Sequence, residues 1–122
     1  FCMPKGELSS MAKARNYFHG ATSTECESLL PPLLKRVVGV PGDSVLIDSH
    51  GVTINGTHIP TSEPRKQDSA GREMPAPGAT AKILNSGEFV LVAPHELSLD
   101  SRYFGPVSRS ELLSSAKPIF IF

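Results

Sequence analysis

The sequence predicts a mainly β fold, an antiparallel barrel or sandwich with one or two short helices. Short apolar segments alternate with turn residues through most of the chain, and eleven prolines and ten glycines accompany them without any tryptophan. Many short strands separated by glycine turns are typical of all-β barrels and sandwiches. The length of 122 residues corresponds to one domain with a small core.

The N-terminal region is predicted to hold the main helix, over residues 7–18. Its apolar residues recur at helical spacing and are Leu8, Met11, Ala14 and Phe18. Residues 1–3 are expected to end a strand, because Pro4 and Gly6 follow directly. The apolar face of the helix is expected to cover the core.

Strands are expected in the middle of the chain over residues 34–40 and 44–48, followed by a hairpin over residues 51–59. Asn55-Gly56 is the signature of a type I′ hairpin turn. Val52 and Ile54 alternate with polar residues, which indicates a ribbon with one exposed face.

The second half begins with an expected exposed loop over residues 61–77, which is rich in Ser, Pro, Gly and charged residues. Further strands are expected at residues 80–84, 88–93, 103–107 and 118–122, with one helical turn at residues 110–113.

Composition excludes several classes of function. Twelve basic and twelve acidic residues balance, so no nucleic-acid partner is expected. No run of about 18 apolar residues is present, so no transmembrane helix is expected within this span. No glycine-rich phosphate loop occurs, and His19, His50, His58 and His95 lack metal-ligand spacing. Neither a metal nor another cofactor is expected.

Lys35 is the first candidate for chemistry. It is flanked by apolar residues on both sides, namely Leu33, Leu34, Val37 and Val38. Burial disfavours the charged form of a lysine and lowers its pKa, as a lysine general base near neutral pH requires. The alternative is a lysine at a strand start whose amine reaches out to water.

Two sequence boxes resemble known ones. KRVVGVPGDSV, residues 35–45, resembles the lysine box of type I signal peptidases, the Ser/Lys peptidases of family S26. SLDSRYFGPV, residues 98–107, is similar to a second box of that family. The segments FCMPKGE, MAKAR, GVTINGTHIP and RYFGPVSRS resemble the branch that matures the pilin of conjugal type IV secretion systems, so that the resemblance covers nearly the whole chain.

The resemblance implies a signal-peptidase-like fold and a role for four residues. Lys35 matches the general base, and Ser98 matches a serine that hydrogen-bonds the lysine amine and orients it. Asp100 and Arg102 match an ion pair that holds the second box in place. A Ser/Lys pair is a known variant of nucleophilic hydrolysis and needs no histidine.

The nucleophilic serine is not found within this span. In the family it lies in an S-x-P box upstream of the lysine, and no S-x-P precedes Lys35. Ser9-Ser10-Met11 resembles part of that box but reads as helix. We therefore expect a single periplasmic-type catalytic domain over residues 1–122 that lacks the serine box and the membrane anchor, and that is inactive alone.

Cys2 and Cys26 bracket the predicted helix. Their spacing allows either a disulfide or two buried free thiols. The resemblance places the domain outside the cytoplasm and so favours the disulfide, which would contribute about 3 kcal/mol in the chain-entropy model. The resemblance also offers a second interpretation of the helix, as a lid near the substrate groove.

The expected partners follow from the same resemblance. They are a pilin precursor as substrate and the bacterial inner membrane, reached from its periplasmic face through an upstream anchor. The product is a matured pilin, which some members of this branch also cyclise. Two alternatives stay open: a general signal peptidase for secreted proteins, and a non-catalytic β scaffold of the secretion apparatus. The oligomeric state is not indicated.

Overall fold

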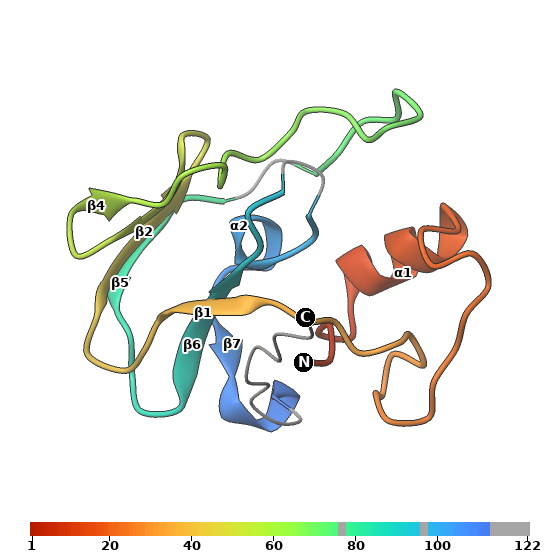
Figure 1. The fold of residues 1–122 in the computed structure, drawn as a ribbon, viewed down its shortest axis with the longest axis horizontal. Coiled ribbons are helices and arrows are strands. Elements are labelled where there is room, and N and C mark those ends of the chain that lie inside the picture. The colour runs from red at the N-terminus through yellow and green to blue at the C-terminus, as the bar shows by residue number, and fades with distance from the viewer. Residues whose placement is uncertain (76–77, 96–97, 113–122) are drawn as a thin grey trace, which may run out of the picture. The chain divides into compact units, whose positions relative to one another are not determined.

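The computed structural model describes residues 1–75, 78–95 and 98–112 and divides the chain into two compact units. One unit comprises residues 1–34 together with the segment from Ser110 onward, and the other comprises residues 35–109 (Figure 1).

The unit of residues 35–109, the β unit, contains two antiparallel sheets (Figure 1). The other unit is the N-terminal unit. The three-stranded sheet has the order β1 (Arg36–Gly39), β6 (Glu88–Val92), β7 (Val107–Ser108). The four-stranded sheet has the order β4 (Thr57–His58), β3 (Gly51–Ile54), β2 (Ser44–Asp48), β5 (Thr80–Ile83). The prediction of a mainly β antiparallel fold with few short helices is confirmed.

One apolar cluster draws side chains from both sheets. Val45 and Ile47 of β2 are buried while Leu46 between them is exposed, because successive side chains of a strand point to opposite faces. Val52 and Ile54 of β3 are also buried, as their alternation predicts. The buried members of the cluster are Val45, Ile47, Val52, Ile54, Leu84, Val90 and Val92.

The turn after β1 is tied to the β3–β4 hairpin. The backbone N–H of Val40 donates to Asp43 Oδ2 at 3.0 Å, and Asn55 Nδ2 donates to Asp43 Oδ1 at 3.0 Å. These bonds lower the pKa of Asp43, that from Val40 most and that from Asn55 next. Asn55 and Gly56 have φ values of 50° and 80°, which fits the predicted type I′ turn.

The segment after β4 largely forms the predicted loop. Gln67 and Glu73 form one isolated antiparallel bridge, and Asp68 pairs with Arg72 at 2.9 Å. The root of this loop is buried at Ser62, whose Oγ accepts from Val52 N at 2.9 Å and donates to Ile59 O.

The predicted strand over residues 103–107 is wrong. Ser101–Phe104 forms the short helix α2, and strand β7 begins only at Val107. Asp100 caps α2 by accepting from Arg102 N, and Gly105 ends the helix at a φ of 74°. The predicted helical turn is seen as the 3-10 helix η1 (Arg109–Glu111), and the predicted strand at residues 118–122 lies outside the described residues.

The N-terminal unit contains the helix α1 (Glu7–Ala14), shorter than predicted. It ends early because the backbone reaches a φ of 55° at Asn16, which α-helix does not allow. Residues 1–3 form no assigned strand, which corrects that prediction, although Phe1 and Leu33 exchange two backbone hydrogen bonds. Among the described residues, no helix is long and apolar enough to cross a membrane.

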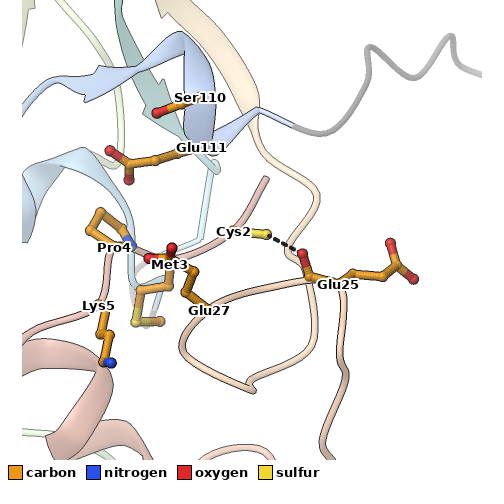
Figure 2. Close-up of a pocket in the computed structure, with 8 residues that line it drawn as sticks. All are labelled: Cys2, Met3, Pro4, Lys5, Glu25, Glu27, Ser110 and Glu111. Carbon is orange, nitrogen blue, oxygen red and sulfur yellow. Dashed lines mark hydrogen bonds between the residues drawn. The ribbon is translucent and has the colours of Figure 1, made fainter.

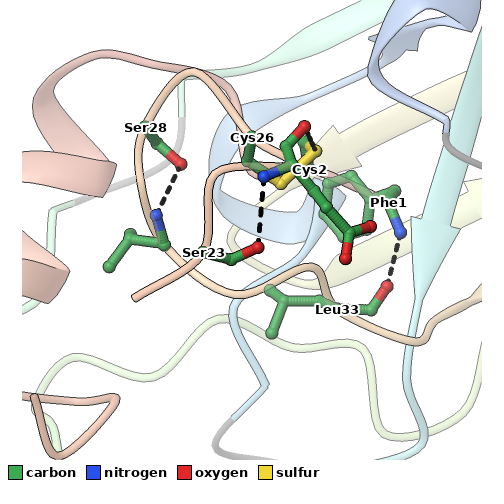
Figure 3. Close-up of a disulfide and its surroundings, with 8 residues drawn as sticks. Phe1, Cys2, Ser23, Cys26, Ser28 and Leu33 are labelled. Carbon is green, nitrogen blue, oxygen red and sulfur yellow. Dashed lines mark hydrogen bonds between the residues drawn. A yellow bond between two sulfur atoms is a disulfide. The ribbon is translucent and has the colours of Figure 1, made fainter. Parts of the chain in front are cut away.

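Cys2 and Cys26 are joined by a disulfide, with Cα atoms 5.4 Å apart (Figure 3). Among the residues that the structure describes, the buried hydrophobic residues of this unit are Met3, Ala12, Cys26 and Leu30. A hollow of about 430 Å³ adjoins Cys2 and is lined in part by Glu25, Glu27 and Glu111 (Figure 2).

Candidate active site

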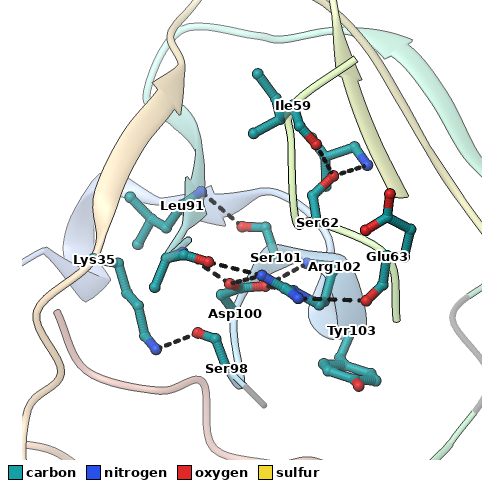
Figure 4. A network of polar contacts seen from close by, with 12 residues as sticks. Lys35, Ile59, Ser62, Glu63, Leu91, Ser98, Asp100, Ser101, Arg102 and Tyr103 are labelled. Atoms are coloured by element: carbon teal, nitrogen blue, oxygen red, sulfur yellow. Dashed lines mark hydrogen bonds and ion pairs between the residues drawn. The ribbon is translucent and has the colours of Figure 1, made fainter. Parts of the chain in front are cut away.

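The structure brings Lys35 and Ser98 together although 63 positions separate them in the sequence. Lys35 Nζ donates to Ser98 Oγ at 2.6 Å (Figure 4). Lys35 directly precedes β1, whose first residue, Arg36, pairs with Val92 at the end of β6. The chain leaves β6 at this point and returns with Ser98, so the β1–β6 pairing determines where the lysine and the serine meet.

The pKa of Lys35 lies below its usual value. Burial is the largest cause, because it disfavours the charged ammonium; the carboxylate of Asp100 acts in the opposite direction, and the guanidinium of Arg102 lowers the pKa further. A lysine with a lowered pKa has a larger fraction of neutral amine near neutral pH. Such an amine can accept a proton from a neighbouring hydroxyl.

Asp100 and Arg102 form a fully buried ion pair at the N-terminus of α2. Both side chains are 0% exposed, and Arg102 Nε and Nη2 reach the two carboxylate oxygens at 2.8 Å and 3.0 Å. Asp100 Oδ2 also accepts from Ala93 N at 3.0 Å, and Arg102 Nη2 donates to Ala93 O at 2.9 Å. The pair therefore hydrogen-bonds both the N–H and the C=O of Ala93, the residue that follows β6.

Two further contacts connect α2 with the loop after β4. Arg102 Nη1 donates to Glu63 O at 3.4 Å, and Tyr103 Oη accepts from Arg65 N at 2.8 Å. Sequence reasoning interpreted Tyr103 only as a core aromatic and said nothing of Ala93. Ala93 acts through its backbone, so its side chain carries no signal of this contact.

Ser101 is a third residue that sequence reasoning missed. It is 0% exposed, and its Oγ accepts from the backbone N–H of Leu91 at 2.9 Å (Figure 4). Its position between Asp100 and Arg102 in the second box was the available signal.

The two cysteines that the sequence analysis named are not members of this cluster. Cys2 and Cys26 belong to the N-terminal unit, where the disulfide joins them. Within the ranges that the structure describes, no group of three or more His, Cys, Asp or Glu side chains is suited to hold a metal ion.

The comparison with known families agrees with the two boxes. The sequence pattern of the family described as signal peptidase, peptidase S26, matches residues 8–121. The chain therefore belongs to the signal peptidase family.

Individual relatives point to one branch of that family. The plasmid transfer protein TraF of Escherichia coli is 35% identical over 120 residues, covering 98% of this chain and 66% of the relative. The conjugal transfer protein TraF of Agrobacterium tumefaciens is 35% identical over 129 residues, covering 99% of this chain and 65% of the relative. The chain thus spans slightly less than two thirds of these relatives.

The chain is also similar to a solved structure. A signal peptidase I from Enterococcus faecalis aligns with a TM-score of 0.41 and 21% identity, over 70% of this chain and 82% of that one. Together with the sequence relatives, the family match confirms the predicted resemblance to signal peptidases and to the conjugal-transfer branch.

Proposed function

We propose that this chain is the catalytic domain of a Ser/Lys endopeptidase that matures the pilin precursor of a conjugal type IV secretion system. The observation that carries the proposal is the 2.6 Å contact between Lys35 Nζ and Ser98 Oγ, in a setting that lowers the lysine pKa. Membership of the signal peptidase family supports the peptidase reaction, and the TraF relatives support the setting in conjugation.

In this mechanism the neutral amine of Lys35 takes the proton of a serine hydroxyl, which attacks the scissile carbonyl carbon. The resulting ammonium then protonates the leaving amine, and an acyl-enzyme remains. Ser98 orients Lys35 by accepting a hydrogen bond from its amine. The pair of Asp100 and Arg102 holds the loop that carries Ser98.

The attacking serine is placed outside residues 1–122. Ser98 matches the orienting serine of the second box, and no serine before Lys35 stands in the S-x-P context of the family box. Residues 1–122 alone are accordingly expected not to cleave the precursor. The complete protein is proposed to work at the periplasmic face of the inner membrane, held there by an upstream anchor.

The acyl-enzyme can be resolved in two ways. Attack by water releases a linear pilin, and attack by the amine of the same pilin chain releases a ring. The mass of the product distinguishes the two, because the ring lacks one molecule of water.

The test uses the full-length protein and a pilin precursor. Wild type is expected to cleave, while Lys35→Ala folds and shows a rate lower by at least about 10²–10⁴-fold, the range for loss of a general base. Lys82→Ala is the matched control, since Lys82 lies on β5 and pairs with Glu88 at 2.7 Å. Equal cleavage by wild type and Lys35→Ala, or cleavage by neither, would refute the proposal and favour the scaffold.

A further inference from the structure

Within the part of the chain that the structure describes, no strand covers one edge of β6 along its whole length. Strand β7 pairs with Glu88 and Phe89, and Arg109 N donates to Gly87 O at 2.8 Å. Backbone groups of alternate residues point to the same edge of a strand. Leu91 and Ala93 therefore present their backbone groups to the edge where β7 would continue, but the chain there has turned into α2.

Three consecutive side chains take the place of the missing strand. Asp100 Oδ2 accepts from Ala93 N at 3.0 Å, Ser101 Oγ accepts from Leu91 N at 2.9 Å, and Arg102 Nη2 donates to Ala93 O at 2.9 Å. Figure 4 shows these side chains converging on the end of β6. The family resemblance gives a role to the two charged residues and leaves Ser101 without one.

Ser101 links the two partners of the Lys35–Ser98 contact. On one side, Leu91 pairs with Val37, two residues after Lys35. On the other side, Ser98 lies three residues before Ser101 in the same loop. The bond from Leu91 N to Ser101 Oγ thus closes a ring that runs from Lys35 through β1 and β6 to Ser101 and back to Ser98.

We propose that Ser101 is a positioning residue, whose hydroxyl holds the loop against β6 so that Ser98 meets Lys35. Its effect on processing rests on the proposed function, whereas its effect on Lys35 does not. Without the hydroxyl, the buried N–H of Leu91 loses its acceptor, and the loop must move or admit water to satisfy it. Either change separates Ser98 from Lys35 and rehydrates the amine.

The first measurement is the titration of Lys35 in residues 1–122. The Lys35 amine is acylated at a series of pH values, and the extent of acylation is read from the peptide mass. The charged groups that act on this amine, Asp100 and Arg102, are kept. Ser101→Ala is expected to raise the pKa of Lys35 towards that of an ordinary lysine. Each unit of that rise lowers acylation near neutral pH about tenfold, since only the neutral amine reacts.

Ser62→Ala is the matched control. Ser62 is also 0% exposed, and its Oγ also accepts a backbone N–H, from Val52 at 2.9 Å. It lies at the four-stranded sheet, so its loss is expected to reduce stability without moving the titration of Lys35. If Ser101→Ala leaves Lys35 titrating as wild type and Ser62→Ala do, the proposal is wrong.

A second pair of variants covers the case in which Ser101→Ala does not fold. Ser101→Thr and Ser101→Val have the same branched shape, and only the threonine keeps the hydroxyl. Lys35 is expected to stay close to wild type in the threonine variant and to titrate higher in the valine variant. Equal titration in the two would overturn the role of the hydroxyl.

Processing by the full-length protein separates this inference from the proposed function. We expect Ser101→Ala to lower kcat near neutral pH with little change in KM, and to recover partly at higher pH. If wild type does not process the pilin precursor, the proposed function fails while the titration of Lys35 still decides the role of Ser101.

Discussion

Different interactions stabilise each of the two units of this chain internally. The β unit has an apolar cluster that draws side chains from two sheets. It also has a fully buried ion pair, Asp100 with Arg102, whose side-chain nitrogen and oxygen atoms have hydrogen-bond partners. In its described residues, the N-terminal unit has the helix α1 of eight residues, a few buried apolar side chains and a disulfide. In the N-terminal unit this disulfide is a covalent link that constrains the unfolded chain.

The proposed site lies in the β unit, and buried polar contacts hold its residues in place. The side chains of Asp100, Ser101 and Arg102 bond to backbone groups at the edge of β6. The site is therefore expected to form together with the sheet. Burial excludes water from Asp100 and Arg102, and each charge therefore depends on the other. The N-terminal unit, by contrast, is expected to loosen without affecting the β unit.

The largest effect is expected from Asp100→Ala in the β unit. It leaves the guanidinium of Arg102 buried without a counter-ion, which costs about 3–5 kcal/mol of unfolding free energy. Denaturant unfolding measures this loss. Glu88→Ala serves as control because its partner, Lys82, is partly exposed to water, and a much smaller loss is expected. Similar losses in both variants would contradict the difference between buried and surface pairs.

The next effect is expected from replacing both cysteines, Cys2→Ser with Cys26→Ser. The variant is expected to lose about 3 kcal/mol of unfolding free energy, because the disulfide no longer constrains the unfolded chain. Hydrogen exchange is expected to speed up across residues 1–34 while β2, β3 and β6 remain protected. Uniform loss of protection through both units would show that they do not differ in the way described.

A smaller, pH-dependent effect is expected from Lys35. Its pKa is lowered, so the neutral amine becomes more abundant as pH rises through the folded-state value, and processing is expected to rise with it. In the unfolded chain the proton is held up to about pH 10.5. Between the two values the unfolded state binds more protons, so stability rises with pH there.

Lys35→Met tests this sign in two measurements. The variant is expected to lose both the rise in processing and that part of the rise in stability, as followed by unfolding at several pH values. A pH dependence of stability identical to wild type would contradict the burial of Lys35.

The smallest effect is expected from Asp43→Ala at the turn after β1. The lowered pKa of Asp43 means that its stabilisation is present above the unfolded pKa and is lost as pH falls through the folded one. Wild type and variant are expected to differ slightly in melting temperature at neutral pH and not at all in strong acid. Impaired processing by this variant would mean that the turn serves the site.

Local sequence determined much of the fold. Alternation identified the buried faces of β2 and β3, and Asn55-Gly56 identified the hairpin turn, because both depend on neighbouring residues alone. The same reasoning failed at Tyr103 and Phe104, which were expected in a strand and lie in α2. There Asp100 caps the helix and Ser101 bonds to Leu91, and neither contact can be inferred from local propensity.

The sequence was enough to identify the alternating strands β2 and β3, the two boxes, and Lys35, Ser98, Asp100 and Arg102 as candidates. The family resemblance already implied that Ser98 hydrogen-bonds Lys35, whereas the tertiary structure was needed to show that Ala93 is held through its backbone and that Ser101 bonds to the edge of β6. The physical reason is that strand pairing joins residues distant in sequence, and a buried backbone group must find its partner in whatever segment the fold places beside it.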